Sequence, residues 1–145
     1  MTKTRTTRIM AFLPALFFLA AAAAGAADRA FNVRDYGATG VKKDNAQPAL
    51  QKAVDACAAA GGGTVFIPAG EYSTGTIHLR SHIRIFLESG ATLYSIKDKA
   101  AFDKDNPSLF YAQDVSNITL GGRGTVNGQA GYVRRLKGDH QDDYI

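Results

Sequence analysis

Gly61-Gly62-Gly63-Thr64-Val65-Phe66-Ile67-Pro68-Ala69-Gly70-Glu71-Tyr72 is the stretch of this chain that decides its fold. The three glycines stop a helix, because glycine enters the left-handed backbone region without the steric penalty of a Cβ. Residues 64–67 then supply β-branched and aromatic side chains, which suit a pleated strand. Pro68 and Gly70 end that strand, since proline removes a backbone donor and glycine allows a tight bend. We therefore predict a junction between a helix and a series of short strands.

The residues before the glycines predict one amphipathic helix of about 14 residues. Asn45 is the expected N-cap, and Pro48 fits the first turn, where a missing N–H is tolerated. The apolar side chains share one helical face: Leu50, Ala53, Val54 and Cys57. Cys57 is the only cysteine, so we expect it to be buried as a small apolar side chain rather than to form a disulfide. We predict that this face covers the strands that follow and caps one end of their stack.

The rest of the chain predicts short strands separated by turns. Residues 30–38 are expected to form a first extended strand that ends at Gly37. After the glycines, Ser81-His82-Ile83-Arg84-Ile85 with Gly90-Ala91-Thr92-Leu93 resembles Ser116-Asn117-Ile118-Thr119-Leu120 with Gly124-Thr125-Val126. The offset is 35 residues between Ile83 and Ile118 and 33 between Leu93 and Val126. Strands this short could form a sandwich, but a repeat of this length favours a stacked architecture. We predict a parallel β-helix with coils of about 24 residues and an insertion at residues 97–107.

The N-terminal residues have the pattern of a cleaved secretory signal. Three basic residues, Lys3, Arg5 and Arg8, precede an apolar run over residues 9–24, and Ala24-Gly25-Ala26 offers a cleavage site. A membrane anchor is the alternative, but the run contains a proline, lacks a charged stop-transfer flank and is shorter than the about 20 residues of a span. We predict a signal peptide at residues 1–26 and a secreted or periplasmic protein. Residues 27–145 are expected to form the cap and first coils of a β-helix domain that continues beyond this chain.

The charge of the chain lies largely in this signal. The formal net charge is +4, from 17 Lys and Arg against 13 Asp and Glu. Three of the basic residues and none of the acidic ones lie in residues 1–26, which leaves +1 for the rest. We therefore expect no nucleic-acid partner and no membrane association after cleavage. His78, His82 and His140 lack the spacing of metal ligands, so we predict no metal and no cofactor. We also expect the protein to be a monomer.

Several segments resemble a known family. Residues 31–38, 50–57 and 61–72 resemble the opening of the pectate-lyase-like superfamily. Thr74-Gly75-Thr76-Ile77-His78-Leu79 with Glu88-Ser89-Gly90-Ala91-Thr92-Leu93, and Gly122-Arg123-Gly124-Thr125-Val126-Asn127-Gly128, narrow this to glycoside hydrolase family 28, the polygalacturonase-like hydrolases of pectin. The resemblance covers residues 31–129 in order. It implies an all-β fold, a right-handed parallel β-helix, here with an N-terminal amphipathic capping helix. Lysines in the loop at residues 40–45 depart from the family pattern, which concerns local packing alone.

The resemblance also implies a reaction and a substrate. Members of this family hydrolyse galacturonate-containing glycosidic bonds with inversion, using one carboxylic acid on the leaving oxygen and a carboxylate that activates water. Their motifs, Asn-Thr-Asp, Asp-Asp, Gly-His-Gly and Arg-x-Lys, do not occur here in that order. Arg135-Leu136-Lys137 and Asp142-Asp143 imitate two of them in reversed order, within a charged run typical of a solvated loop. We therefore assign no catalytic residue and expect the chain alone to be inactive on its pectic polysaccharide substrate.

Substrate-binding residues stay open at this point. His78, Arg80 and Arg84 could form the lower edge of a groove for an anionic sugar, but simple alternation with apolar neighbours explains them as outward-facing residues, and we favour this second interpretation. Asn117 begins a glycosylation sequon, yet its amide is expected to bond a neighbouring turn. The alternative function is a non-catalytic β-helix module, such as a tailspike-like adhesin that binds polysaccharide. A third possibility is that the chain has no activity of its own, an exposed β-helix end being a template for aggregation.

Overall fold

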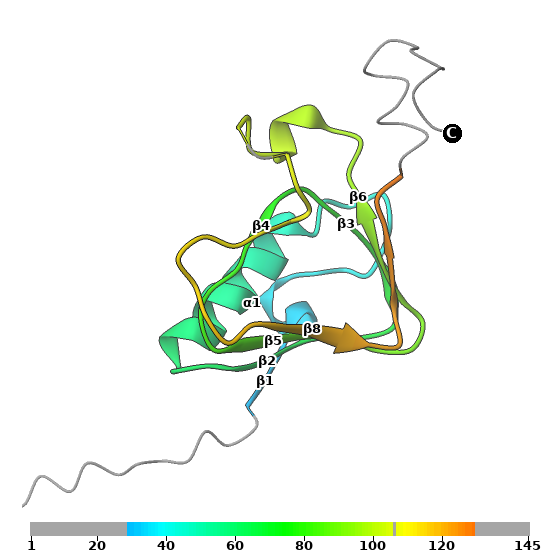
Figure 1. The fold of residues 1–145 in the computed structure, drawn as a ribbon. Coiled ribbons are helices and arrows are strands. Elements are labelled where there is room, and N and C mark those ends of the chain that lie inside the picture. The colour runs from blue at the N-terminus through cyan, green and yellow to red at the C-terminus, as the bar shows by residue number, and fades with distance from the viewer. Residues whose placement is uncertain (1–28, 106, 130–145) are drawn as a thin grey trace, which may run out of the picture.

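The computed structural model describes residues 29–105 and 107–129, coloured in Figure 1. The predicted signal peptide and the charged segment at residues 134–144 lie outside the described residues. The described elements in chain order are β1 (Ala30–Asn32), η1 (Val33–Tyr36), α1 (Gln47–Ala59), β2 (Gly63–Ile67), β3 (Gly70–Thr74), β4 (Ile77–His78), β5 (Ile83–Leu87), β6 (Ala91–Ser95), η2 (Lys99–Ala101), β7 (Phe110–Tyr111), β8 (Thr119–Gly122) and β9 (Thr125–Asn127).

The strands form three parallel sheets that the chain visits in turn. Their orders are β1-β2-β5-β8, β3-β6-β9 and β4-β7, and every described pair is parallel. One coil runs through β2, β3 and β4, the next through β5, β6 and β7, and β8 and β9 begin a third (Figure 1). The prediction of stacked parallel coils is therefore confirmed.

The register of the sheets confirms the internal repeat. Arg84 pairs with Thr119 and Leu93 with Val126, which are the two offsets that the sequence predicts. The predicted coil length of 24 residues was wrong, because Gly63 pairs with Ile83 and Gly70 with Ala91. A coil without its insertion is therefore shorter by three or four residues. The longer offset of the next coil comes from residues 97–107, which hold η2 and lie between β6 and β7 as expected.

Stacked apolar side chains fill the interior of the coils. Val65 lies beside Ile85 and Tyr72 beside Leu93 in neighbouring coils, and all four side chains are buried. Each such burial stabilises the fold by about 1.5–3 kcal/mol. The stack requires little more than one aliphatic or aromatic side chain at each inward position, which is why the repeat is visible in the sequence.

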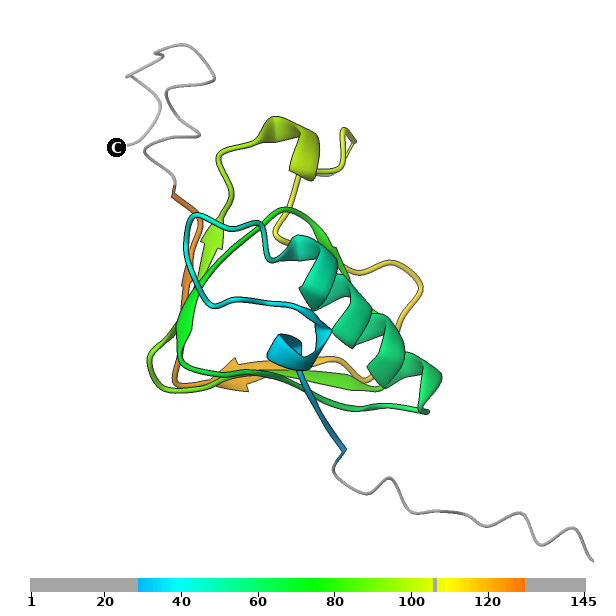
Figure 2. The ribbon, with the colours of Figure 1, turned by 180° about the vertical axis from the view of Figure 1, so that it is seen from behind.

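Helix α1 adds its apolar face to this core. The predicted face is buried, at Leu50, Ala53, Val54 and Cys57, and contacts β1, β2 and β4. Cys57 is a fully buried free thiol, which confirms its expected packing. The N-cap prediction was one residue off: Ala46 occupies that position, while the Asn45 side chain accepts from the backbone N–H of Gln47. Figure 2 shows α1 lying across the coil that it contacts.

One edge of each sheet is covered by residues from this N-terminal region. Strand β1 pairs with β2, and residues 40–46 bond to β3 through Glu71 N–H and Ser73 C=O. On β4 the partner is a side chain. The Gln51 carboxamide accepts from His78 N–H (2.9 Å) and donates to His78 C=O (3.0 Å), as a neighbouring strand would. Gln47, one helical turn before Gln51, donates to the carbonyl of Thr76 (2.8 Å).

Two strand predictions needed correction. The first strand ends at Asn32 rather than Gly37, because the Asn32 side chain accepts from Arg34 N–H and starts the 3₁₀-helix η1. Strand β3 was not predicted, since its residues Ser73 and Thr74 are polar although both are buried.

Candidate functional site

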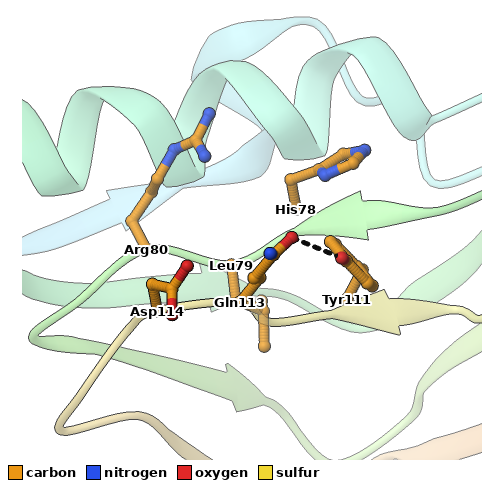
Figure 3. A pocket seen from close by; sticks show the side chains of 6 residues that line it. All are labelled: His78, Leu79, Arg80, Tyr111, Gln113 and Asp114. Atoms are coloured by element: carbon orange, nitrogen blue, oxygen red, sulfur yellow. Dashed lines mark hydrogen bonds between the residues drawn. The ribbon is translucent and has the colours of Figure 1, made fainter.

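A cavity of about 390 Å³ opens beside β4 and β7. Its lining residues are His78, Leu79, Arg80, Tyr111, Gln113 and Asp114, shown in Figure 3. The volume falls at the lower end of the about 300–1,000 Å³ that small-molecule sites usually enclose. All but one of these side chains carry polar groups, so the cavity offers donors and acceptors rather than an apolar surface.

Strand register brings the two halves of the cavity together. His78 pairs with Tyr111, and Leu79 N–H bonds the Tyr111 carbonyl (2.8 Å). The His78 and Tyr111 rings consequently meet edge to face, with centroids 5.5 Å apart and planes at 74°. Arg80 follows β4, while Gln113 and Asp114 follow β7. The cavity is therefore built by two segments that an insertion separates in the sequence.

Hydrogen bonding and backbone geometry orient the β7 half. The Tyr111 hydroxyl donates to Gln113 Oε1 (2.7 Å), so the carboxamide nitrogen of Gln113 points away from Tyr111 (Figure 3). Asp114 has a φ of 53°, in the left-handed region that Asp tolerates better than most residues. This turn places Asp114 among the residues that line the cavity.

The two basic residues of the cavity are each tied to a carboxylate. His78 Nε2 lies 3.2 Å from Asp103 Oδ2, and Arg80 Nε lies 3.0 Å from Asp55 Oδ1 on α1. Both pairs are roughly half exposed, and such pairs stabilise a fold by at most about 1 kcal/mol. The Asp55 carboxylate offsets the charge of Arg80, and the Asp103 carboxylate lies beside His78, so the cavity does not present a net cationic surface.

The structure separates the three basic residues that the sequence singled out. His78 and Arg80 line one cavity, whereas Arg84 is exposed on β5, in another sheet, with its guanidinium 5.1 Å from the centre of the Phe86 ring. Arg84 alternates with buried Ile83 and Ile85, as the outward-facing interpretation predicts. The three residues therefore do not form one groove.

Sequence reasoning missed the β7 half of the cavity. Tyr111, Gln113 and Asp114 belong to a polar stretch without periodicity. The signal that could have found Tyr111 is the 33-residue offset of Leu93 and Val126, because the same offset relates Ile77 to Phe110 and His78 to Tyr111.

Asn117 lies at the entrance of β8 and has the turn role that the sequence predicts. Its side-chain nitrogen is 3.0 Å from Nδ1 of His82, the residue at the same corner of the preceding coil. Both residues have positive φ values, 56° and 62°. Their side chains thus connect equivalent turns of neighbouring coils.

Two side chains away from the cavity have shifted pKa values. Burial raises the pKa of the Cys57 thiol, because the thiolate would be desolvated. The hydrogen bond that Tyr94 donates to Glu71 (2.9 Å), together with partial desolvation and the Glu71 charge, raises the pKa of Tyr94. Lys42 Nζ lies 3.7 Å over the Tyr94 ring. Neither group contacts the cavity, so neither shift bears on its chemistry.

Over residues 29–105 and 107–129, no group of three or more His, Cys, Asp or Glu side chains could hold a metal ion. Within these ranges, none of the helices has the length and hydrophobicity needed to cross a membrane. The imitations of catalytic motifs at residues 135–137 and 142–143 lie outside the described part of the chain.

Comparison with protein families decides the membership of the chain. Residues 30–140 match the model of the rhamnogalacturonase A/epimerase, pectate-lyase-like family. The chain belongs to this family. The match includes the N-terminal helix, all three described coils and the cavity.

Relatives within the family differ in activity. The chain is 33% identical over 102 residues to an exopolygalacturonase of Platanus acerifolia, covering 68% of this chain and 26% of the relative. It is 41% identical over 134 residues to alginate lyase 7 of Azotobacter vinelandii, covering 79% of this chain and 15% of the relative. It is 34% identical over 102 residues to the mannuronan C5-epimerase AlgE2 of the same organism, covering 62% of this chain and 10% of the relative. The chain thus spans between a tenth and about a quarter of the length of these relatives.

Solved structures share the fold. A putative glycosyl hydrolase from Parabacteroides merdae superposes with a TM-score of 0.72 at 29% identity, covering 81% of this chain and 52% of that one. The family 28 exopolygalacturonase of Yersinia enterocolitica gives 0.62 at 30% identity, with 70% and 21% covered. PfbA, a surface adhesin of Streptococcus pneumoniae, gives 0.55 at 31% identity, with 68% and 24% covered. These likenesses identify the parallel coils as those of a pectate-lyase-like β-helix.

Proposed function

We propose that the chain is the N-terminal part of a secreted or periplasmic enzyme that hydrolyses galacturonate-containing bonds of pectic polysaccharides with inversion. The observation that carries this proposal is the family match over residues 30–140, together with the likeness to exopolygalacturonases in both sequence and structure. The Gly-Arg-Gly-Thr-Val-Asn-Gly element at residues 122–128 supports membership of glycoside hydrolase family 28 within this wider family. We assign the catalytic carboxylates to coils beyond this chain.

We also propose that α1 caps a right-handed β-helix. Its support is the set of contacts at the first coil, where Gln51 bonds to backbone groups of β4 and Gln47 to the carbonyl of Thr76, directly before β4. Strand β1 and residues 40–46 do the same for the other two sheets. Right-handed winding follows from the strong preference of parallel crossover connections.

Three enzyme chemistries among the relatives are separated by their products. A hydrolase releases new reducing ends and forms no double bond. A lyase also releases reducing ends, but it leaves a carbon–carbon double bond that absorbs ultraviolet light at the non-reducing end of the other fragment. An epimerase leaves the chain length unchanged. The test is to incubate the complete gene product with polygalacturonate, rhamnogalacturonan and alginate. We expect reducing ends from one of the two pectic substrates without new ultraviolet absorbance, and equal rates with and without EDTA. Cleavage of alginate alone, or ultraviolet-absorbing products, would contradict the proposal.

A second candidate function is polysaccharide binding without catalysis. The likeness in fold to PfbA, a surface adhesin of Streptococcus pneumoniae, favours it. Binding of the gene product to immobilised polygalacturonate with no release of reducing ends from any substrate would support this candidate over the hydrolase.

A further inference from the structure

We propose that the cavity beside β4 and β7 binds a neutral sugar unit of the polysaccharide through its hydroxyl groups, in preference to a uronate. This inference rests on the proposed action on a polysaccharide and adds the kind of sugar that this part of the chain contacts. Its four supports are the charge, the hydrogen-bonding groups, the aromatic surface and the size of the cavity.

The charge of the cavity disfavours an anionic ligand. Arg80 is paired with Asp55 and His78 with Asp103, both within 3.2 Å. Asp114 forms no salt bridge with any described residue, so it presents an uncompensated carboxylate to the cavity. A uronate carboxylate bound here would lie near this like charge, which lowers its affinity.

The polar groups match sugar hydroxyls, which both donate and accept hydrogen bonds. Asp114 can only accept, and the Gln113 carboxamide nitrogen can donate because its oxygen already accepts from Tyr111. The Nε–H of Arg80 donates a hydrogen bond to Asp55, and the terminal N–H groups of its guanidinium remain as further donors. Donors and an acceptor therefore line the same opening, as adjacent hydroxyls on a ring require.

Tyr111 supplies the apolar surface that such a site also needs. Its hydroxyl bonds to Gln113 and its ring packs against the His78 ring, so the Tyr111 ring has a defined orientation (Figure 3). Aromatic rings offer a large contact area to the C–H groups of a sugar face. With about 390 Å³, the opening holds a short piece of saccharide rather than a large ligand.

The test compares two sugars that differ at one carbon. D-galactose and D-galacturonate share every ring hydroxyl, and galacturonate has a carboxylate at C6. Each is titrated into the ¹⁵N-labelled complete gene product, without its predicted signal peptide, while amide shifts are followed by NMR. We expect galactose to shift the amides of residues 78–80 and 111–114, and galacturonate to bind about threefold more weakly.

Two variants and one control sharpen the result. Asp114→Asn removes the like charge and keeps a residue that tolerates the left-handed region, so galacturonate should then bind as well as galactose. Tyr111→Ala should abolish the galactose shifts. Arg84→Ala, on another sheet, should change neither titration. The control spectrum of each variant shows whether it is folded.

Galacturonate binding at least as tight as galactose to the unmodified chain, or no shift at these amides with either sugar, would overturn the inference. The reducing-end assay is independent of these shifts. Hydrolysis without galactose binding rejects the cavity alone, and galactose binding without hydrolysis rejects the proposed reaction alone.

Discussion

The two ends of the described coil stack show how equivalent positions acquire different burial. Val65, Ile85 and Leu120 occupy one interior row, yet the first two are 1% and 2% exposed and Leu120 is 51% exposed. In the next row, Tyr72 and Leu93 are fully buried while Val126 is 46% exposed. The side chains are alike, so the difference arises from what lies on either side of each coil. An apolar residue in this architecture is stabilised by the neighbouring coil rather than by its own strand.

The largest expected effect compares Ile85 with Leu120. Ile85→Ala should lower the free energy of unfolding by about 2–5 kcal/mol, because it opens a cavity between two coils. Leu120→Ala should change it by about 1 kcal/mol or less, since half of that side chain already contacts solvent. Urea unfolding followed by circular dichroism measures both. Equal losses in the two variants would mean that the exposed row is covered in solution.

The side chain of Gln51 bonds α1 to the backbone of β4 in the first coil. Gln51→Leu keeps the volume but leaves the His78 N–H and C=O without their partner, which should cost about 1–3 kcal/mol. Lys52→Leu is the matched control, because Lys52 is exposed on the same helix and should stay within about 0.5 kcal/mol. If both substitutions leave stability unchanged, the glutamine does not hold the helix to β4.

The buried thiol of Cys57 on α1 predicts that the protein loses stability at alkaline pH. The pKa of Cys57 is raised by burial, so its contribution is fully present below the thiol's unfolded pKa of about 8.5 and is lost as the pH rises through the folded value. The urea midpoint of the unmodified chain should therefore fall more between neutral and strongly alkaline pH than that of Cys57→Ala. Parallel pH profiles would show that the thiolate is accommodated without opening the core.

The smallest effect is expected at Tyr94, on the exposed face of the β3-β6-β9 sheet. The bond to Glu71 raises the Tyr94 pKa, so it stabilises the fold below the tyrosine's unfolded pKa of about 10 and is lost as the pH rises through the higher folded value. A spectrophotometric titration of Tyr94→Phe should lack a late-titrating tyrosine that is present in the unmodified chain. A titration curve with no such loss would place the late group elsewhere.

The parts of the fold that sequence reasoning could predict are those specified locally. The spacing of Leu50, Ala53, Val54 and Cys57 defines a helix face by itself, and the glycines after it end that helix. The offset between Leu93 and Val126 could be read because each coil repeats a Thr-aliphatic strand after a glycine. Local pattern is sufficient where every coil must meet the same packing requirement.

The parts that could not be predicted depend on contacts across the insertion. Tyr111 joins His78 only because β7 pairs with β4, and the polar residues between them give no period to follow. Strand β3 was hidden because Ser73 and Thr74 are buried through hydrogen bonds rather than through apolar character, with the Ser73 hydroxyl donating to the Lys42 carbonyl. The end of β1 likewise depends on one side-chain bond, from Arg34 N–H to Asn32.

The stereochemistry of the released sugar tests the functional proposal most directly. The complete gene product is mixed with polygalacturonate in an NMR tube, and the anomeric signal of the new reducing end is followed before mutarotation. An inverting hydrolase produces the anomer opposite to that of the cleaved bond first, because water attacks from the far side of the ring. We predict this inverted anomer. A reducing end that first appears with the original configuration, or an unsaturated product, would contradict the assignment of this chain to a pectin-hydrolysing member of its family.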